Sequence, residues 1–155
     1  MRKKVIIASD SFKDSLSSKE VCEAIAKGIR KIDAKVEILQ RPLADGGEGT
    51  ARLLTQLRSG KWMNFPVHDP LGRKHEAGLG WLEQERLVFM DMAEASGIQL
   101  LRPEQRNPLL TSTYGFGELL LQAFQLNPQK VVIGIGGSAT NDGGIGMAQA
   151  LGYRF

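Results

Sequence analysis

Short apolar runs and helical repeats alternate along the first 60 residues of the chain. Residues 5–8 are a continuous apolar run that stops at a polar loop, which is typical of a buried parallel strand. Residues 17–20 have the spacing of a capping box, and apolar residues then recur at helical period from Val21 to Ile32. A strand near residues 35–40 and a helix near 50–57 follow. This βαβα order predicts a parallel sheet with right-handed crossovers and ligands at the carboxyl ends of the strands.

The middle of the chain has a different pattern. Extended runs lie around residues 62–67, 77–82 and 87–92, and a Pro-Leu-Gly turn at 70–72 separates the first two. Strands this close together, without helical segments between them, favour an antiparallel excursion or an inserted subdomain.

The last third returns to alternating elements. Hydroxyls at residues 111–113 can cap a helix with an apolar face from Leu119 to Leu126, and Asn127-Pro128 ends it. Residues 130–135 then read as a strand, residues 145–151 as a helix, and the chain stops in mid-pattern. We therefore expect an α/β fold: a parallel, flavodoxin-like three-layer sheet domain with a smaller, partly antiparallel insertion. The expected segments are 1–60, 61–102 and 103–155.

Composition narrows the class of protein. The 155 residues are 42% hydrophobic and 24% charged, as in an ordinary globular domain. The net charge of +3 is spread along the chain, so nucleic-acid binding is not indicated. The single cysteine, Cys22, lies in a helical pattern and reads as a small helix residue, which favours a reducing compartment. No apolar run reaches the ~20 residues of a membrane span, so we expect a cytoplasmic protein without membrane contact.

Residues 134–144, with the sequence Gly-Ile-Gly-Gly-Ser-Ala-Thr-Asn-Asp-Gly-Gly, join the last strand to the last helix. A glycine-rich loop in this position presents backbone N–H groups to one point, and the helix N-terminus adds partial positive charge, which suits phosphate. The loop also matches the degenerate G-x-G-x-x-A dinucleotide pattern, but the chain contains no Walker A sequence. A purely structural glycine loop is the remaining interpretation.

Carboxylates follow several of the predicted strands: Asp10, Asp45, Asp91 and Asp142. In one parallel sheet, Asp10, Asp45 and Asp142 converge on one edge, where they suit magnesium or a base that accepts a hydroxyl proton. Each aspartate alone can equally cap a loop or form an Asx turn.

The basic side chains also have both a functional and a structural interpretation. Lys13 and Arg106 can bind a carboxylate or phosphate, or can be solvated surface charges. His68 and His75 lack a metal-ligand pattern, and we expect them to be structural or exposed.

Four motifs together resemble the bacterial glycerate kinase family: Asp10-Ser11-Phe12-Lys13, residues 43–50 (Leu-Ala-Asp-Gly-Gly-Glu-Gly-Thr), Arg106-Asn107-Pro108-Leu109 and residues 134–144. Their order and approximate spacing agree along nearly the full chain. The resemblance implies transfer of a phosphoryl group from ATP to D-glycerate at its 2-hydroxyl, with Mg²⁺, on two α/β domains. Family members are substantially longer, so this chain resembles the N-terminal portion of such an enzyme.

The resemblance and the motifs suggest a role for each candidate residue. Asp45 is the candidate base or metal-orienting group, Lys13 and Arg106 are anion contacts, and Asp142 is a magnesium contact. Asp10 joins the catalytic candidates, and the candidates for substrate or phosphate binding are Ser11, Gly46, Gly47, Glu48, Gly136, Gly137, Ser138, Thr140 and Asn141.

The residues do not decide which loop binds ATP and which binds glycerate, nor do they give an oligomeric state. Two other functions stay open: a nucleotide-cofactor oxidoreductase that binds NAD(P), and a non-catalytic module that binds phosphate compounds.

Overall fold

The computed structural model describes residues 3–13 and 15–155. By its internal contacts the chain forms two compact units, residues 1–45 and 46–155, each with its own sheet. The structure is a mixed α/β fold with parallel and antiparallel strand pairs, as the sequence predicts. The segment boundaries at 60 and 102 stay predictions.

The first unit is a βαβ arrangement, in which β1 (Lys4–Ile7) pairs in parallel with β2 (Glu37–Gln40). Helix α1 (Ser18–Ile32) connects the two strands and begins with the predicted capping box, in which Ser17 and Glu20 bond each other's backbone N–H groups. Its small core contains Ile7 and the buried Cys22. The parallel pairing and the cap are therefore confirmed, whereas the burial expected of residues 5–8 is wrong within this unit, since Ile7 alone of β1 is buried and Ile6 is 64% exposed.

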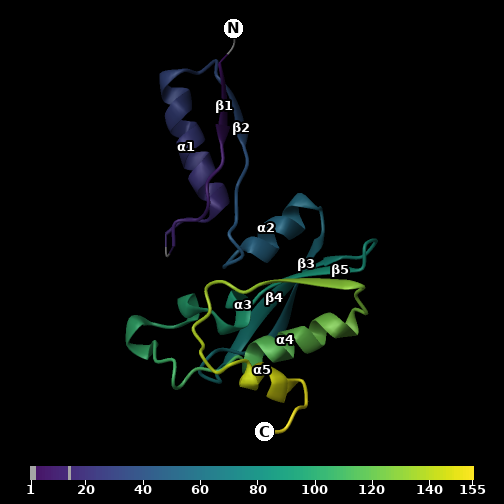
Figure 1. The fold of residues 1–155 in the computed structure, drawn as a ribbon. Helices are drawn as coiled ribbons and strands as arrows, with labels where there is room; N and C mark the ends of the chain where they lie inside the picture. The colour runs from purple at the N-terminus through teal and green to yellow at the C-terminus, as the bar shows by residue number, and fades with distance from the viewer. Residues whose placement is uncertain (1–2, 14) are drawn as a thin grey trace. The chain divides into compact units, whose positions relative to one another are not determined.

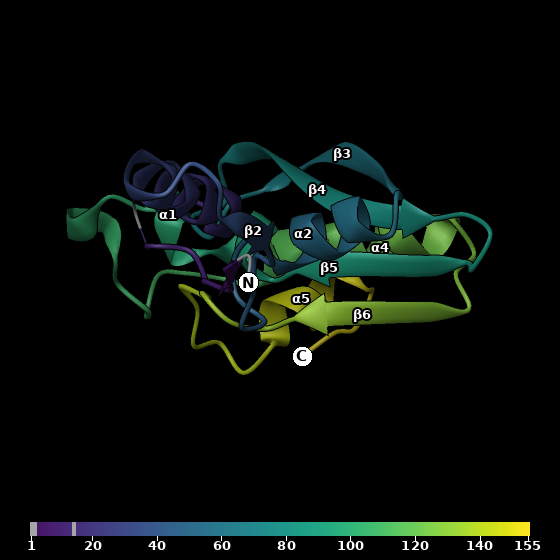
Figure 2. The same ribbon diagram turned by 90° about the horizontal axis from the view of Figure 1, so that it is seen from above.

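The second unit begins with α2 (Thr50–Leu57) and contains a four-stranded sheet in the order β3-β4-β5-β6. Strands β3 (Lys61–His68), β4 (Lys74–Leu82) and β5 (Leu87–Asp91) are antiparallel neighbours, whereas β6 (Lys130–Gly134) pairs in parallel with β5. Figure 2 shows β4, β5 and β6 side by side. The antiparallel middle region is therefore confirmed.

One expectation from the sequence stays a prediction. The convergence of Asp10, Asp45 and Asp142 assumed a single parallel sheet, and in the described residues β6 pairs with β5 in a sheet that contains neither β1 nor β2. Hydrophobic patterning predicts which side chains of a strand are buried, but it does not specify which strand lies beside it, because neighbouring strands are joined by backbone hydrogen bonds that almost every residue type can make. Strand pairing therefore gives no support for one shared carboxylate edge.

Helices cover both faces of the second unit's sheet. Figure 1 shows α2 on one face and α4 (Tyr114–Gln125) on the other, with α5 (Ile145–Ala150) packed against α4. Between β5 and α4 lie α3 (Ala93–Ser96) and two 3-10 turns, Ile98–Leu100 and Pro103–Gln105. The N-cap of α4 is Thr113, whose side chain makes no capping bond, and the Ser112 hydroxyl just before it accepts the Tyr114 N–H.

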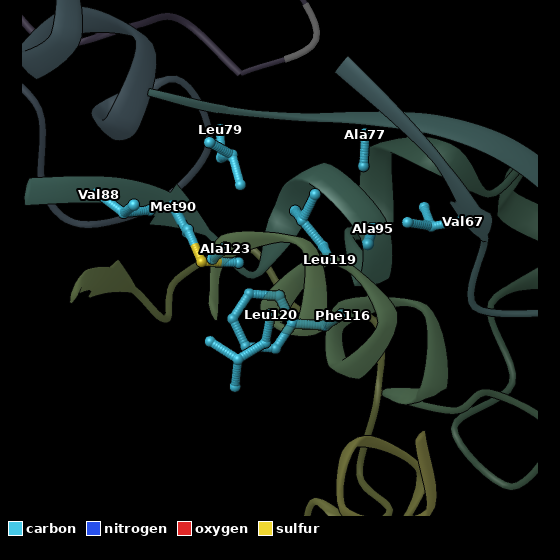
Figure 3. Close-up of a cluster of buried hydrophobic side chains, with 10 residues drawn as sticks. All are labelled: Val67, Ala77, Leu79, Val88, Met90, Ala95, Phe116, Leu119, Leu120 and Ala123. Atoms are coloured by element: carbon cyan, nitrogen blue, oxygen red, sulfur yellow. The ribbon is translucent and has the colours of Figure 1, made fainter. Parts of the chain in front are cut away.

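Coverage on both faces explains why every residue of β5 is buried. Val88 and Met90 face α4 and join the larger core with side chains such as Phe116 and Leu119 (Figure 3). Leu87 and Phe89 belong to a second cluster with Ala51 of α2. Asp91 continues this second row of β5, so its carboxylate lies on the side of the sheet that α2 covers.

Candidate active site

Two glycine-rich segments of the second unit lie against each other at the carboxyl end of β6. The Gly136 N–H donates a hydrogen bond to the Gly46 carbonyl at 2.9 Å. A Cβ atom on Gly136 would lie 2.8 Å from Gly47 Cα, closer than carbon atoms approach without displacement. The structure therefore brings together the predicted phosphate-binding residues 46–48 and 136–137. This close approach requires glycine at position 136.

A third segment holds the same loop from the end of α3. The Ile98 N–H donates to the Gly137 carbonyl at 2.9 Å, and the Ala139 N–H donates to the Ser96 carbonyl at 2.8 Å. Within the loop, the Ser138 hydroxyl accepts the Thr140 N–H at 3.1 Å and lies 2.7 Å from the Thr140 hydroxyl. The loop is thus fixed by contacts before any ligand arrives.

These bonds leave a defined set of donors. Gly137, Asn141 and Gly143 are exposed. Among the residues that the structure describes, no acceptor is bonded to the backbone N–H groups of Gly137, Ser138, Asn141, Asp142 and Gly143. Unbonded N–H groups in a glycine-rich loop are suited to an anion such as phosphate. The N–H groups of Gly136, Ala139 and Thr140 are instead used inside the protein.

Asp142 connects the loop to the starts of α4 and α5. Its carboxylate accepts hydrogen bonds from the Thr113 N–H at 2.8 Å, the Thr113 hydroxyl at 2.9 Å, and the N–H groups of Gly144 and Gly146 at 3.1 and 3.2 Å. Burial raises the pKa of this carboxyl, but the bonds from Thr113, Gly144 and Gly146 outweigh burial and leave the pKa below its usual value. The carboxylate is therefore ionised at neutral pH and already hydrogen-bonded. Its role as a magnesium contact stays a prediction.

Another carboxylate, Asp91, follows its strand in the sequence and lies outside the predicted set of site residues. It is fully buried, and both of its oxygens lie 3.0 Å from the Ala51 N–H. Burial raises its pKa from 3.8 to about 7, the Ala51 bond opposes the rise, and the negative charge of Glu94 adds to it. The available sequence signal was the position of an acid at the end of an entirely apolar strand.

The remaining predicted residues of the second unit are less embedded. Arg106 is exposed and its Nε donates to the Leu101 carbonyl at 3.3 Å. Glu48 is half-buried, with Oε2 3.9 Å from the point that a Cβ on Gly137 would occupy. Glu48 therefore lies beside the glycine-rich loop.

Four candidates belong to the first unit. Asp10 Oδ1 accepts the Ser11 N–H at 2.7 Å, and Lys13 is exposed. Asp45 is exposed and immediately precedes Gly46 in the chain. The catalytic roles of Asp10, Lys13 and Asp45 stay predictions, as does the substrate contact of Ser11.

The two histidines have local partners. His68 Nδ1 lies 2.9 Å from the Glu118 carboxylate, and His75 Nε2 lies 2.9 Å from the Glu94 carbonyl. No group of three or more His, Cys, Asp and Glu side chains in the described ranges could hold a metal ion. The helices of residues 3–13 and 15–155 include none that is long and apolar enough to cross a membrane.

The fold and the loop define an α/β protein whose glycine-rich loop carries unbonded backbone N–H groups. The Glycerate kinase family matches residues 5–155, and the chain belongs to this family. It is 47% identical over 152 residues to a glycerate kinase of Bacillus cereus, covering 98% of this chain and 40% of the relative. It is also 47% identical over 151 residues to the glycerate 2-kinase of Escherichia coli, covering 97% of this chain and 40% of the relative.

A solved structure supports the same relationship. The chain is similar to the crystal structure described as "putative glycerate kinase 2 from Salmonella typhimurium LT2", with a TM-score of 0.73 and 46% identity over 97% of this chain and 41% of that one. The chain thus spans about 40% of the length of the curated relatives it matches.

Proposed function

We propose that this chain takes part in ATP-dependent phosphorylation of D-glycerate at the 2-hydroxyl, which yields 2-phosphoglycerate. The observation that carries the proposal is the loop from Gly137 to Gly143, which offers unbonded N–H groups beside the Gly46–Glu48 segment. Family membership supports the same reaction class, and the name glycerate 2-kinase of the Escherichia coli relative supports the 2-position.

Phosphoryl transfer requires a protein chiefly to position two substrates and to neutralise charge on the transferred group. The bond from the γ-phosphorus to the bridging oxygen of ATP breaks, a new bond forms to the 2-oxygen of glycerate, and the hydroxyl proton passes to a base. We assign the phosphate to the unbonded N–H groups of the 137–143 loop, with Asn141 as a side-chain donor. Asp45 is the candidate base, and Lys13 and Arg106 are candidate contacts for the carboxylate or phosphates.

The described residues fit nucleotide phosphates better than they fit a metal held by protein alone. The Asp142 oxygens accept several N–H and O–H donors, and no carboxylate cluster accompanies them in the described ranges. Mg²⁺ commonly takes one or two carboxylates together with substrate phosphates and water. We therefore propose that Mg²⁺ arrives with ATP, which it makes a better electrophile by withdrawing charge, and that Asp142 primarily shapes the loop.

The first experiment measures turnover. The chain is incubated with D-glycerate, ATP and Mg²⁺, and the products are separated by phosphorus NMR, which distinguishes 2-phosphoglycerate from the 3-isomer. We expect the 2-isomer. The variant Asp45→Asn is expected to reduce kcat by about a hundredfold or more, because removing a general base typically costs that much. Asp33→Asn, at another acid of the first unit, is the matched control and is expected to leave kcat unchanged.

Ligand binding then separates this function from its alternatives. Calorimetric titration with Mg·ATP and, separately, with NAD(P) is expected to show binding of Mg·ATP alone. Binding of NAD(P) without ATP would favour an oxidoreductase. If Mg·ATP binds but no phosphoryl transfer occurs with glycerate present, the result would favour a non-catalytic phosphate-binding module.

A further inference from the structure

Asp91 lies where β5 meets α2, on the strand's α2-facing row with Leu87 and Phe89. The side chain is fully buried, and both carboxylate oxygens lie within hydrogen-bond distance of the Ala51 N–H, at 3.0 Å each. A strand-end carboxylate thus reaches across to the first turn of a helix that is 40 residues earlier in the chain.

Helix α2 has no cap of its own that could replace this contact. Its N-cap is Gly49, in the left-handed conformation at φ 83°, and no side chain from that position bonds the helix. The backbone N–H groups of Gly49 and Thr50 also act on the Asp91 carboxyl and lower its pKa, together with that of Ala51. Since a helix N-terminus attracts an anion, the Asp91 carboxylate supplies the negative charge at the start of α2.

The same carboxylate touches the other glycine-rich segment. Asp91 is paired with Gly134 in the β5–β6 register. A Cβ on Gly134 would lie 2.6 Å from Asp91 Oδ1 and 2.7 Å from the Gly46 carbonyl oxygen. One carboxylate, one glycine and one carbonyl therefore meet at the point where the segment 46–51 approaches the segment 134–137.

Stability alone does not account for a carboxylate here. Burial is the main reason that the pKa of Asp91 rises to about 7, and the nearby Glu94 charge raises it further. Ionised Asp91 therefore costs folding free energy. Such a group at the edge of a candidate site points to a role beyond stability.

We propose that Asp91 is a positioning residue, whose carboxylate holds segment 46–51 against segment 134–137 and so sets the phosphate-binding geometry of the 137–143 loop. The identity of the ligand rests on the proposed function, whereas the contact between the two segments is independent of that function.

The test compares Asp91→Asn with Asp69→Asn in the 155-residue chain. Asp69 is a matched control because it is also an almost fully buried acid that accepts backbone N–H groups, but its partners Leu71 and Arg73 lie in the turn after β3. Amide hydrogen exchange by NMR measures how fast the Gly136 and Ala51 N–H groups exchange with solvent. Calorimetry gives the affinity for Mg·ATP and for tripolyphosphate. We expect Asp91→Asn to accelerate exchange of both amides and to weaken both affinities, each by about tenfold or more. Asp69→Asn is expected to change neither.

The outcomes discriminate among the possible roles. Faster exchange with unchanged affinity would overturn the proposal and leave Asp91 as a structural cap, and unchanged exchange would overturn it directly. If Asp91→Asn gives no folded protein, Asp91→Ser is measured instead, with the same expected results. A wild-type chain that binds tripolyphosphate but transfers no phosphoryl group to glycerate contradicts the proposed function alone, whereas one that binds no phosphate compound overturns both.

Discussion

Raising the pH is expected to destabilise the second unit through Asp91. Its pKa is about 7 in the folded protein and 3.8 without the environment of the fold, mainly because the carboxyl is buried. Between these values the folded state retains a proton that the unfolded state has released. The protonated Asp91 carboxyl therefore contributes stability that is fully present below the pKa of the unfolded state. This contribution is lost as the pH rises through the pKa of the folded state.

The magnitude follows from the same shift. A difference from 3.8 to about 7, at about 1.4 kcal/mol per pKa unit, corresponds to about 4 kcal/mol in total. The side chain has no exposed surface, so solvent screening does not reduce this figure much. Between the two pKa values, the free energy of unfolding is expected to fall by about 1.4 kcal/mol per pH unit.

The assay is urea unfolding of the wild type and Asp91→Asn at several values between about pH 5 and pH 8, at constant ionic strength. Tryptophan fluorescence reports the second unit, because Trp62 and Trp81 both lie in it. Asp69 and Asp142 have lowered pKa values, so their stabilisation is lost only as the pH falls below this window. We expect the wild type to lose stability relative to Asp91→Asn as the pH rises. Parallel profiles for the two proteins would refute the reasoning.

Two further substitutions test the packing of the second unit. Gly134→Ala is expected to destabilise it by about 1–3 kcal/mol, because the added methyl would overlap Asp91 Oδ1 and the Gly46 carbonyl. Urea unfolding measures this, and wild-type stability would contradict the close approach. Leu119→Ala removes a fully buried core side chain and is expected to cost about 2–5 kcal/mol by the same measurement. Leu109→Ala, at a side chain that is 90% exposed, is its control and is expected to cost less than about 0.5 kcal/mol.

Local patterns predict most elements because their causes are local. The spacing of Ser17 and Glu20 is sufficient to specify the start of α1, since both capping bonds lie within one turn. The hydroxyls before α4 show the limit of such reasoning. The N-cap residue is Thr113, but its hydroxyl makes no capping bond and instead donates to Asp142 and accepts the Met147 N–H at the start of α5, while Ser112 accepts the Tyr114 N–H. A local motif indicates that a hydroxyl is available, and the distant partner depends on packing.

Candidate residues are predictable to a similar extent. The glycine-rich segments 46–49 and 134–144 are visible in the sequence because left-handed backbone and close approach both require glycine, as at Gly137 with φ +73°. Which N–H groups of the loop remain for a ligand could not be predicted. That depends on acceptors at Gly46 and Ser96, which the tertiary fold brings to the loop.

The sequence by itself determined the order of the strands and of α1, α2, α4 and α5, but not α3 or the two 3-10 turns beside it. It also determined the glycine-rich loop and the resemblance to the glycerate kinase family, since these follow from turn chemistry and motif spacing. Only the tertiary structure decided that β6 pairs with β5 and that the buried Asp91 carboxylate meets both glycine-rich segments. The physical reason is that strand pairing and burial depend on contacts between distant parts of the chain, to which the local pattern of side chains is nearly indifferent.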